Sequence, residues 1–299
     1  MTGTPPPVVT RVAEARGSRP LTWRRPECGL SAAERWAIRL ADGSSVFVKA
    51  AVDADTSRWL ATERQALDLV GGRFGPAVLD WLDGNQWPVL VTEDLSEAYW
   101  PAGTGVTRWR PGDMAAVIDR LADLRALPAP DALAAIATPP ARWAQLLAGD
   151  DLVRTGLCSR VWARANGPAL VAADTDPDPV PTCLVHGDVR SDNLCLTGDG
   201  AVWFVDWSNT GAGHPFHDLT TLLPTLRLEG GPAPADVLVQ PVEVIVRAAG
   251  ATAYRAVHGT SGPDWLQAVM LRLAAIGLTW VSAALGCAPP DGPRAADWI

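Results

Sequence analysis

The spacing of apolar positions changes along the chain, from an alternating pattern in the N-terminal part to a helical one further on. Short apolar runs bounded by turn residues predict strands at residues 36–40, 45–49, 77–82 and 89–92. Between the second and third of these runs, residues 56–70 place apolar side chains at helical spacing. We therefore expect a small β-rich part that contains one helix.

The rest of the chain is predominantly helical in pattern. We expect helices at residues 114–127, 141–147, 152–165, 235–249 and 264–286. The last is nearly long enough to span a bilayer, but Asp264, Gln267 and Arg272 interrupt it, which predicts a buried core helix and no membrane partner. The proline-rich segment 1–10 lacks the features of a signal peptide, and we expect a loose tail there.

One polar loop, residues 186–193, lies between a strand-like run and a hairpin pattern whose turn is at 197–200. Folding the chain back at that turn brings Asn193 opposite Asp206, within a residue of register, and Asp188 lies just upstream. Carboxylate and amide oxygens of this kind suit Mg²⁺. A solvated or calcium-stabilised turn is the alternative, although the EF-hand spacing is absent.

The same residues carry a family resemblance. His186-Gly187-Asp188 with Asn193, and Val205-Asp206-Trp207 after the hairpin, resemble the catalytic core of the aminoglycoside phosphotransferase and choline kinase-like family. These small-molecule kinases are related to protein kinases, whose equivalent motifs are His-Arg-Asp and Asp-Phe-Gly. The resemblance implies that Asp188 is the catalytic base and that Asn193 and Asp206 are Mg²⁺ ligands. Asp192, inside the loop, is given no role.

Lys49 ends the predicted strand 45–49, and Glu63 lies in the predicted helix 56–70. Alone, Lys49 would be interpreted as a surface lysine at a strand edge. A strand lysine followed by a helix glutamate is, however, the kinase arrangement that positions the α- and β-phosphates of the nucleotide. By resemblance, we assign Lys49 and Glu63 to nucleotide binding.

The resemblance also suggests where the rest of a nucleotide would lie. Residues 24–31 take the place of the loop over the phosphates but contain no G-x-G-x-x-G, so fewer backbone amides are available there, and Ser31 is a candidate contact. Glu93 and Leu95 fall at the hinge, where main-chain groups of the family hold the adenine edge. An ordinary exit from a strand is the alternative for these two residues.

Several further residues receive supporting roles by resemblance. His186 is expected to be structural, Arg190 either contacts the γ-phosphate or braces the loop, and Asp218 is expected to brace the catalytic loop by hydrogen bonds. Asp297, near the C-terminus, and Trp207 are candidate substrate contacts.

Composition narrows the partners and the compartment. The net charge of −8 over 299 residues argues against a nucleic-acid partner and mildly favours a cationic acceptor. The five cysteines form no C-x-x-C pair, which predicts a reduced, cytoplasmic protein without a zinc site. We expect a monomer or a homodimer.

Together these observations predict an α+β, two-lobed, protein-kinase-like fold, with a nucleotide-binding lobe at 1–95 and a helical lobe at 96–299. The predicted function is transfer of the γ-phosphate of ATP or GTP, with Mg²⁺, to a hydroxyl group of a small molecule, such as an aminoglycoside-like antibiotic in resistance or self-protection. A metabolite kinase for choline, a sugar or a homoserine-like compound has the same core. A non-catalytic nucleotide-binding module is the other alternative. A protein kinase is disfavoured because no Ala-Pro-Glu follows Asp206.

Overall fold

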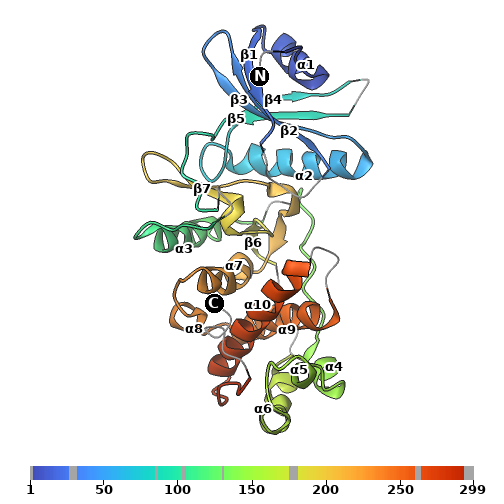
Figure 1. The fold of residues 1–299 in the computed structure, drawn as a ribbon, viewed down its shortest axis with the longest axis vertical. Helices are drawn as coiled ribbons and strands as arrows, with labels where there is room; N and C mark the ends of the chain where they lie inside the picture. Colours follow the sequence, from blue (N-terminus) through green and yellow to red (C-terminus); the bar gives the residue numbers. More distant parts are fainter. Residues whose placement is uncertain are drawn as a thin grey trace. The chain divides into compact units, whose positions relative to one another are not determined.

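The computed structural model of the chain describes residues 3–26, 32–84, 87–102, 106–129, 131–174, 181–259 and 264–292. The chain forms two compact units (Figure 1). The sheet unit comprises Met1–Arg120 with His186–Gly211, and the helical unit comprises Leu121–Val185 with Ala212–Ile299. A small sheet in one unit and helices in most of the other agree with the predicted α+β class.

The sheet unit is built on a five-stranded sheet in which every described pair of neighbours is antiparallel, in the order β1-β2-β3-β5-β4. Its strands are β1 (Pro20–Arg24), β2 (Glu34–Leu40), β3 (Ser45–Ala50), β4 (Val78–Leu82) and β5 (Val89–Glu93). The four predicted strands are confirmed as β2 to β5. β1 was not predicted, because only Trp23 in it is buried and its sequence shows no alternation of apolar residues.

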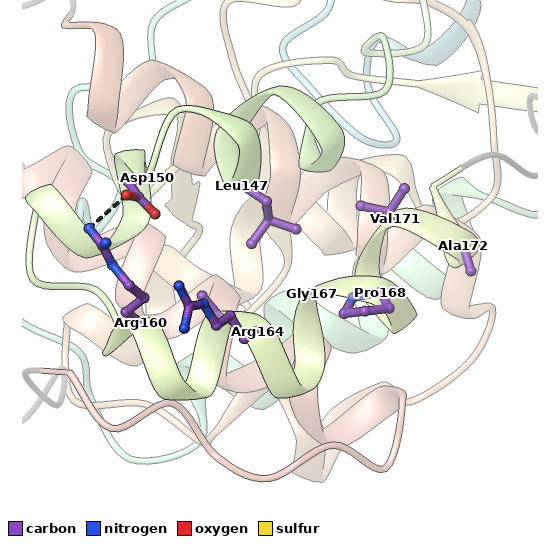
Figure 2. Close-up of a pocket in the computed structure, with 9 residues that line it drawn as sticks. Leu147, Asp150, Arg160, Arg164, Gly167, Pro168, Val171 and Ala172 are labelled. Atoms are coloured by element: carbon purple, nitrogen blue, oxygen red, sulfur yellow. Dashed lines mark hydrogen bonds and ion pairs between the residues drawn. The ribbon is translucent and has the colours of Figure 1, made fainter.

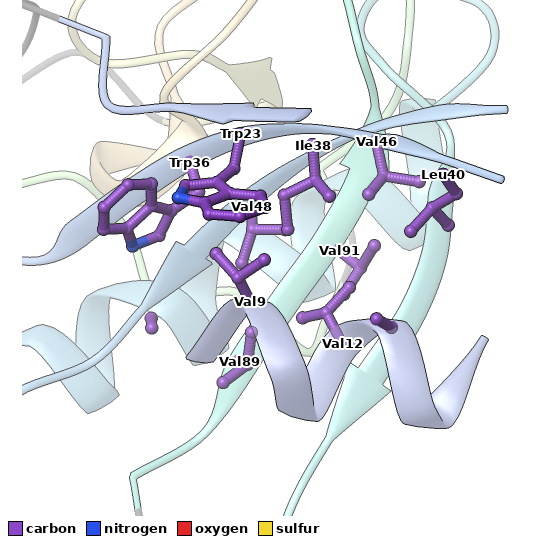
Figure 3. Close-up of a cluster of buried hydrophobic side chains, with 12 residues drawn as sticks. Val9, Val12, Trp23, Trp36, Ile38, Leu40, Val46, Val48, Val89 and Val91 are labelled. Carbon is purple, nitrogen blue, oxygen red and sulfur yellow. The ribbon is translucent and has the colours of Figure 1, made fainter. Parts of the chain in front are cut away.

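The two faces of this sheet have different chemistry, because side chains alternate along each strand. Val46 and Val48 of β3 face an apolar cluster that includes Val9 and Val12 of helix α1 (Pro7–Ala15), as Figure 3 shows. Lys49, between buried neighbours on β3, points to the opposite face. The apolar face therefore stabilises the sheet, and the other face is left for polar chemistry.

The expectation of a loose N-terminal tail is wrong. Val9 and Val12 of α1 are fully buried, and Pro7 stands at the start of the helix, where a missing N–H leaves no donor unpaired. Complete burial of a valine side chain contributes about 1.5–3 kcal/mol. Arg11 of the same helix donates hydrogen bonds to the carbonyls of Leu82 and Trp87 at 3.0 Å each. These contacts hold the helix on the sheet.

Helix α2 (Ala54–Val70) confirms the predicted helix and brings Glu63 to the polar face of the sheet. It starts in a capping box in which Asp53 Oδ1 accepts from Thr56 N at 2.8 Å and Thr56 Oγ1 accepts from Asp53 N at 3.1 Å. This cap fixes where the helix begins. Glu63 then falls on the buried side together with Leu60 and Leu67.

The predicted hairpin belongs to the sheet unit and consists of β7 (Leu194–Leu196) and β8 (Val202–Phe204), with Leu194 paired to Phe204. Short 3₁₀ turns flank it, η1 (Ser191–Asn193) before and η2 (Trp207–Asn209) after. Tyr99 and Leu196 exchange two main-chain hydrogen bonds of 2.8 Å, and Phe204 N donates to Phe74 O at 2.7 Å. The hairpin is thus attached to chain segments far from it in sequence.

Helix α3 (Asp113–Leu124) follows the chain segment that contains Tyr99 and confirms the predicted helix 114–127, three residues shorter at its C-terminal end. The helical unit contains longer and shorter elements that include two short strands. They are α4 (Trp143–Ala148), α5 (Asp151–Arg154), α6 (Arg160–Ala173), β6 (Cys183–Val185), β9 (Gly211–Gly213), α7 (His217–Leu228), α8 (Pro234–Val237), α9 (Val242–His258) and α10 (Asp264–Ala284).

Two predicted helices are wrong because each is divided. The predicted helix 152–165 is α5 and α6, separated at Gly156, whose φ of 73° requires glycine, and at Ser159, which caps α6 by accepting from Trp162 N at 3.0 Å. The predicted helix 235–249 is α8 and α9, because Pro241 stands at the start of α9 and disfavours a helical residue before it.

Helix α10 lies along α9 within the helical unit (Figure 1). By length and composition its segment Trp265–Ala284 could cross a membrane, and 50% of its most apolar window is buried inside the protein. Core helices of soluble proteins have the same properties, so the helix is weak evidence for a membrane span.

The backbone of Gly75 lies close to the end of the hairpin, and a substitution at this position tests how tightly the two segments pack. A Cβ at this position would lie 2.7 Å from Phe204 O and 2.9 Å from Trp207 Nε1. We expect Gly75→Ala to lower the free energy of unfolding by about 1–3 kcal/mol, as for an overpacked core. Gly198→Ala, in the turn of the same hairpin with nothing within 4 Å of its added Cβ, is the matched control.

Urea denaturation of both variants measures the difference. The control should change stability by less than ~1 kcal/mol. Equal stability of Gly75→Ala and the unmodified protein would show that the hairpin does not depend on this approach.

Candidate active site

The polar face of the sheet unit carries a buried ion-pair cluster centred on Lys49. Its Nζ lies 2.8 Å from Glu63 Oε1 and 2.9 Å from Glu63 Oε2, and 2.9 Å from Asp206 Oδ1. The three residues come from β3, from α2 and from the end of the hairpin. Only 11% of the Lys49 side chain and 5% of the Glu63 side chain are exposed, so these two charges compensate each other away from water, whereas 35% of the Asp206 side chain is exposed.

The pKa values follow from this arrangement. Burial alone would lower the pKa of Lys49, but the carboxylates of Glu63 and Asp206 outweigh it, and the pKa lies above its ordinary value. Burial would raise the pKa of Asp206, yet the attraction of Lys49 holds that pKa below its usual range. Burial raises the pKa of Glu63, against the attraction of Lys49, whose ammonium group donates to both Glu63 oxygens and favours their ionised form. A charged lysine between carboxylates is the result.

Asp206 has an unusual backbone. Its φ of 64° and ψ of 57° place it in the left-handed region, which residues other than glycine enter at a cost of about 1–3 kcal/mol. Ser208 Oγ donates to Asp206 Oδ1 at 3.3 Å, in addition to the bond from Lys49. Strain of this kind is typical of functional positions.

Asp188 and Asn193 are brought together as predicted from the loop. Asn193 Nδ2 donates to the main-chain carbonyl of Asp188 at 2.9 Å and to Asp188 Oδ2 at 3.2 Å. Asn193 O accepts from Val205 N at 2.9 Å, which places Asn193 beside the residue that precedes Asp206. Asn193 is therefore opposite Val205, one residue from the predicted partner Asp206 and within the predicted tolerance of one residue.

His186 connects the start of the loop 186–193 to Val205 by hydrogen bonds. Its ring is fully buried, Nδ1 accepts from Asp188 N at 3.2 Å, and Nε2 lies 3.0 Å from Val205 O. Because Nδ1 is an acceptor, we infer that the proton is on Nε2, which donates to the carbonyl. The histidine connects the two motifs through main-chain groups.

Arg190 contacts two carboxylates. Its Nη1 lies 3.2 Å from Asp188 Oδ1, while Nε and Nη2 bind Asp192 in a fork at 3.0 and 3.2 Å. Burial raises the pKa of Asp188, and Arg190 opposes that effect. The contact with Asp192 was not predicted. Its signal in the sequence was an acidic residue two positions after an arginine, a spacing too common to be specific.

The oxygen atoms at this site fit a hard divalent cation. The amide nitrogen of Asn193 donates to Asp188, so Asn193 Oδ1 is the atom that can bind a cation. Asp206 accepts hydrogen bonds from Lys49 and Ser208 through Oδ1. Within the described part of the chain there is no group of three or more His, Cys, Asp or Glu residues suited to a metal. Two oxygen ligands with open coordination positions are what Mg²⁺ needs when it also binds phosphates.

The remaining predicted residues are placed as follows. Glu93 Oε2 accepts from Ala77 N at 2.9 Å, and Leu95 O accepts from Ala98 N and from Trp100 Nε1 at 3.0 Å each. Asp218 is buried in the first turn of α7, in the helical unit, and its bracing role stays a prediction. Ser31 and Asp297 lie outside the described residues.

Trp207 does not fit a substrate contact. Its side chain is fully buried, its indole N–H donates to Phe204 O at 2.9 Å, and its ring centroid lies 4.6 Å from that of His186. The large apolar ring packs beneath the catalytic loop, and no part of it reaches solvent. Its role in this structure is to support the loop.

Two cavities bear on the location of the site. A small one of about 40 Å³ lies on the ion-pair cluster and is lined by Ala33, Arg35, Lys49, Trp59, Leu60, Glu63, Asp206 and Ser208. A larger one of about 640 Å³ lies among α4, α5 and α6 of the helical unit (Figure 2). Its lining is mainly apolar, its ion pair joins Asp150 to Arg160 at 2.7 Å, and none of the predicted site residues lines it. The predicted site residues Lys49, Glu63 and Asp206 therefore lie at the small cavity.

Solved structures are similar to this chain in fold. The macrolide 2′-phosphotransferase MphH from Brachybacterium faecium, as apoenzyme, has a TM-score of 0.51 at 19% identity, over 93% of this chain and 89% of its own. The aminoglycoside phosphotransferase APH(2″)-Ib, bound to ADP, has a TM-score of 0.49 at 13% identity, over 97% and 98% of the two chains. No curated protein matches the chain in sequence. The likeness to the first structure confirms the predicted fold.

The family follows from the sequence match. Residues 22–258 match the model of the phosphotransferase enzyme family, APH, and this range contains the ion-pair cluster, the catalytic loop and the hairpin. The predicted enzyme class, a kinase that acts on a small-molecule hydroxyl, is confirmed at the level of the family. The chain belongs to the phosphotransferase enzyme family, APH.

Proposed function

We propose that this enzyme transfers the γ-phosphoryl group of ATP or GTP to a hydroxyl group of a small molecule, with Mg²⁺ as cofactor. The observation that carries the proposal is the bond of 2.9 Å between Lys49 Nζ and Asp206 Oδ1. This bond places the side chain predicted to bind the nucleotide phosphates next to the side chain predicted to bind the metal. Most of the rate gain in phosphoryl transfer comes from such positioning and charge stabilisation.

Lys49 and its partners prepare the phosphate end of the site. Glu63 holds the ammonium group through both carboxylate oxygens, so Lys49 presents a fixed positive charge to the α- and β-phosphates. Mg²⁺, when held by Asn193 and Asp206, would neutralise charge on the phosphate oxygens. Asp206 keeps its negative charge for this purpose because its pKa is lowered by Lys49.

Asp188 is the group that accepts or orients the proton of the acceptor hydroxyl. Asn193 and Arg190 bind its two carboxylate oxygens and fix its orientation. Burial raises its pKa above that of an ordinary aspartate and makes it a stronger base. Protonation of Asp188 would remove this function.

The base of the nucleotide is proposed to lie against the hinge at Glu93 and Leu95. The carbonyl of Leu95 already accepts two hydrogen bonds within the protein. Of the two main-chain polar groups of Leu95, we therefore expect the N–H to face the base.

The acceptor is proposed to be an antibiotic, and the net charge of −8 favours a cationic one such as an aminoglycoside. A metabolite kinase acting on choline, a sugar or a homoserine-like compound uses the same residues and is the second candidate. A non-catalytic nucleotide-binding module is disfavoured because Lys49, Asp188, Asn193 and Asp206 are all present. We further propose a cytoplasmic monomer or homodimer without nucleic-acid or membrane partners.

Mass spectrometry of acceptors incubated with enzyme, Mg²⁺ and ATP or GTP tests the proposed function. The panel should contain aminoglycosides, macrolides, nucleoside antibiotics, choline, homoserine and sugars. We expect one class to gain a phosphoryl group, and Asp188→Asn to lower turnover by about 10²–10⁴-fold. Nucleotide affinity of the variant should stay within a few-fold of the unmodified protein, because Asp188 serves the acceptor.

Asp199→Asn is the matched control for this substitution, since Asp199 is an exposed aspartate in the turn of the same hairpin. It should retain full turnover. Full activity of Asp188→Asn would show that another group is the base. Tight nucleotide binding with no product from any acceptor would favour the binding-module alternative.

Asn193→Ala tests the metal site separately from catalysis. We expect the Mg²⁺ concentration needed for half-maximal nucleotide binding to rise by about 10-fold or more, because one of two protein ligands is lost. Asn209→Ala, an exposed asparagine of η2, is the control and should leave the requirement unchanged. Calorimetric titration with Mg²⁺ at a fixed nucleotide concentration measures the effect. An unchanged Mg²⁺ requirement of Asn193→Ala would show that Asn193 is not a metal ligand.

A further inference from the structure

A second positively charged side chain lies next to Lys49, on the neighbouring strand β2. Arg35 of β2 pairs with Lys49 of β3 in the antiparallel register, so both side chains leave the same face of the sheet. Arg35 is buried, with 7% of its surface exposed, and its Nη1 donates to Ala33 O at 2.9 Å. Like charges directly opposite each other are unfavourable in a sheet. The position therefore requires anions close by.

Among the described residues that line the small cavity, two cations share two carboxylates. Arg35 and Lys49 line one small cavity with Glu63 and Asp206, which gives two positive and two negative side chains. The attraction of Arg35 reaches both carboxylates, where it opposes the rise in pKa that burial causes. When Asp206 binds a divalent cation, as the proposed function requires, the cluster gains an excess of positive charge. A ligand with several negative charges would balance that excess.

The sequence before β2 gives an independent reason for a second cation. The segment 24–31 has one glycine, Gly29, and lacks the glycine-rich pattern that lets backbone amides approach phosphates closely. Arg35 follows this segment at the start of β2. A guanidinium group offers several N–H donors in a planar fork that matches the oxygens of a phosphate group.

We propose that Arg35 is a second phosphate-binding side chain, which contacts the polyphosphate tail of the nucleoside triphosphate beside Lys49. The inference rests on the proposed function, because it assumes that the nucleotide occupies this site. In this proposal, the guanidinium group of Arg35 makes the phosphate contacts that backbone amides make in glycine-rich loops. Arg35 should then distinguish nucleotides by their phosphates and leave recognition of the base unchanged.

The test compares affinities in the presence of Mg²⁺ for the triphosphate, the diphosphate and the nucleoside, with ATP or GTP chosen by what the unmodified protein binds. Calorimetry measures the two nucleotides, and competition measures the nucleoside. Arg35→Met should weaken triphosphate binding by about 10- to 100-fold, the effect of losing a charge-assisted hydrogen bond. Nucleoside affinity should change by less than about three-fold, within the scatter expected for an untouched contact.

Arg39→Met is the matched control. Arg39 lies on the same strand and the same face, opposite Ser45, and is exposed. It should bind all three ligands as the unmodified protein does. Arg35→Lys keeps the charge but not the fork, and we expect an intermediate loss that is again confined to the phosphorylated ligands.

Two results would overturn the inference. The first is a triphosphate affinity of Arg35→Met equal to that of the unmodified protein, and the second is an equal loss for nucleoside and triphosphate, which would indicate a purely structural role. If Arg35→Met does not fold, Arg35→Lys decides by the same criteria. Absence of nucleotide binding by the unmodified protein would overturn the proposed function as well, so the two failures are distinguishable.

Discussion

The ammonium group of Lys49 is the point on which the geometry of the sheet unit depends. It is buried, and a buried charge is tolerated only where opposite charges and hydrogen bonds replace water. Glu63 supplies two acceptors from α2 and Asp206 supplies one from the end of the hairpin. Three segments far apart in sequence are therefore held within one hydrogen-bond length of a single nitrogen atom. A shift of Glu63 or of Asp206 would remove one of the two carboxylates that compensate the buried charge of Lys49.

This constraint explains why the two faces of the sheet are so different. The face of Lys49 carries Arg35 as well as the buried Leu90, so it does not supply an uninterrupted apolar area. The opposite face does, through Val46, Val48 and Val91, and α1 covers them with Val9 and Val12 (Figure 3). The N-terminal helix thus contributes to the stability of the sheet unit. Lys49 and Arg35 lie on one face of the sheet, and the apolar cluster that includes α1 lies on the other.

Sequence was sufficient for the features that depend on short-range spacing. The hairpin, the convergence of Asp188 and Asn193, and the helix with Glu63 all follow from patterns of a few residues. The breaks at Gly156 and Pro241, which divide two predicted helices, were visible as residues but were outweighed by the apolar periodicity around them. The packing of α1 depends on a sheet assembled from later segments. The pairing of Arg35 with Lys49 was missed because Arg35 precedes the predicted strand 36–40, although the turn between the two strands sets their register.

The catalytic loop shows how a rigid support can select the chemistry of its residues. Both ring nitrogens of His186 have main-chain partners, so a proton on Nδ1 would displace the N–H of Asp188. The ring is also packed against Trp207, with no exposed surface. A histidine held in this way can orient the loop but cannot exchange protons without disrupting it. Asp188 is partly exposed, its oxygens are oriented by Asn193 and Arg190, and it is the group of this loop that we propose as the proton acceptor. The two residues lie two positions apart, and their surroundings give one a structural role and the other a chemical one.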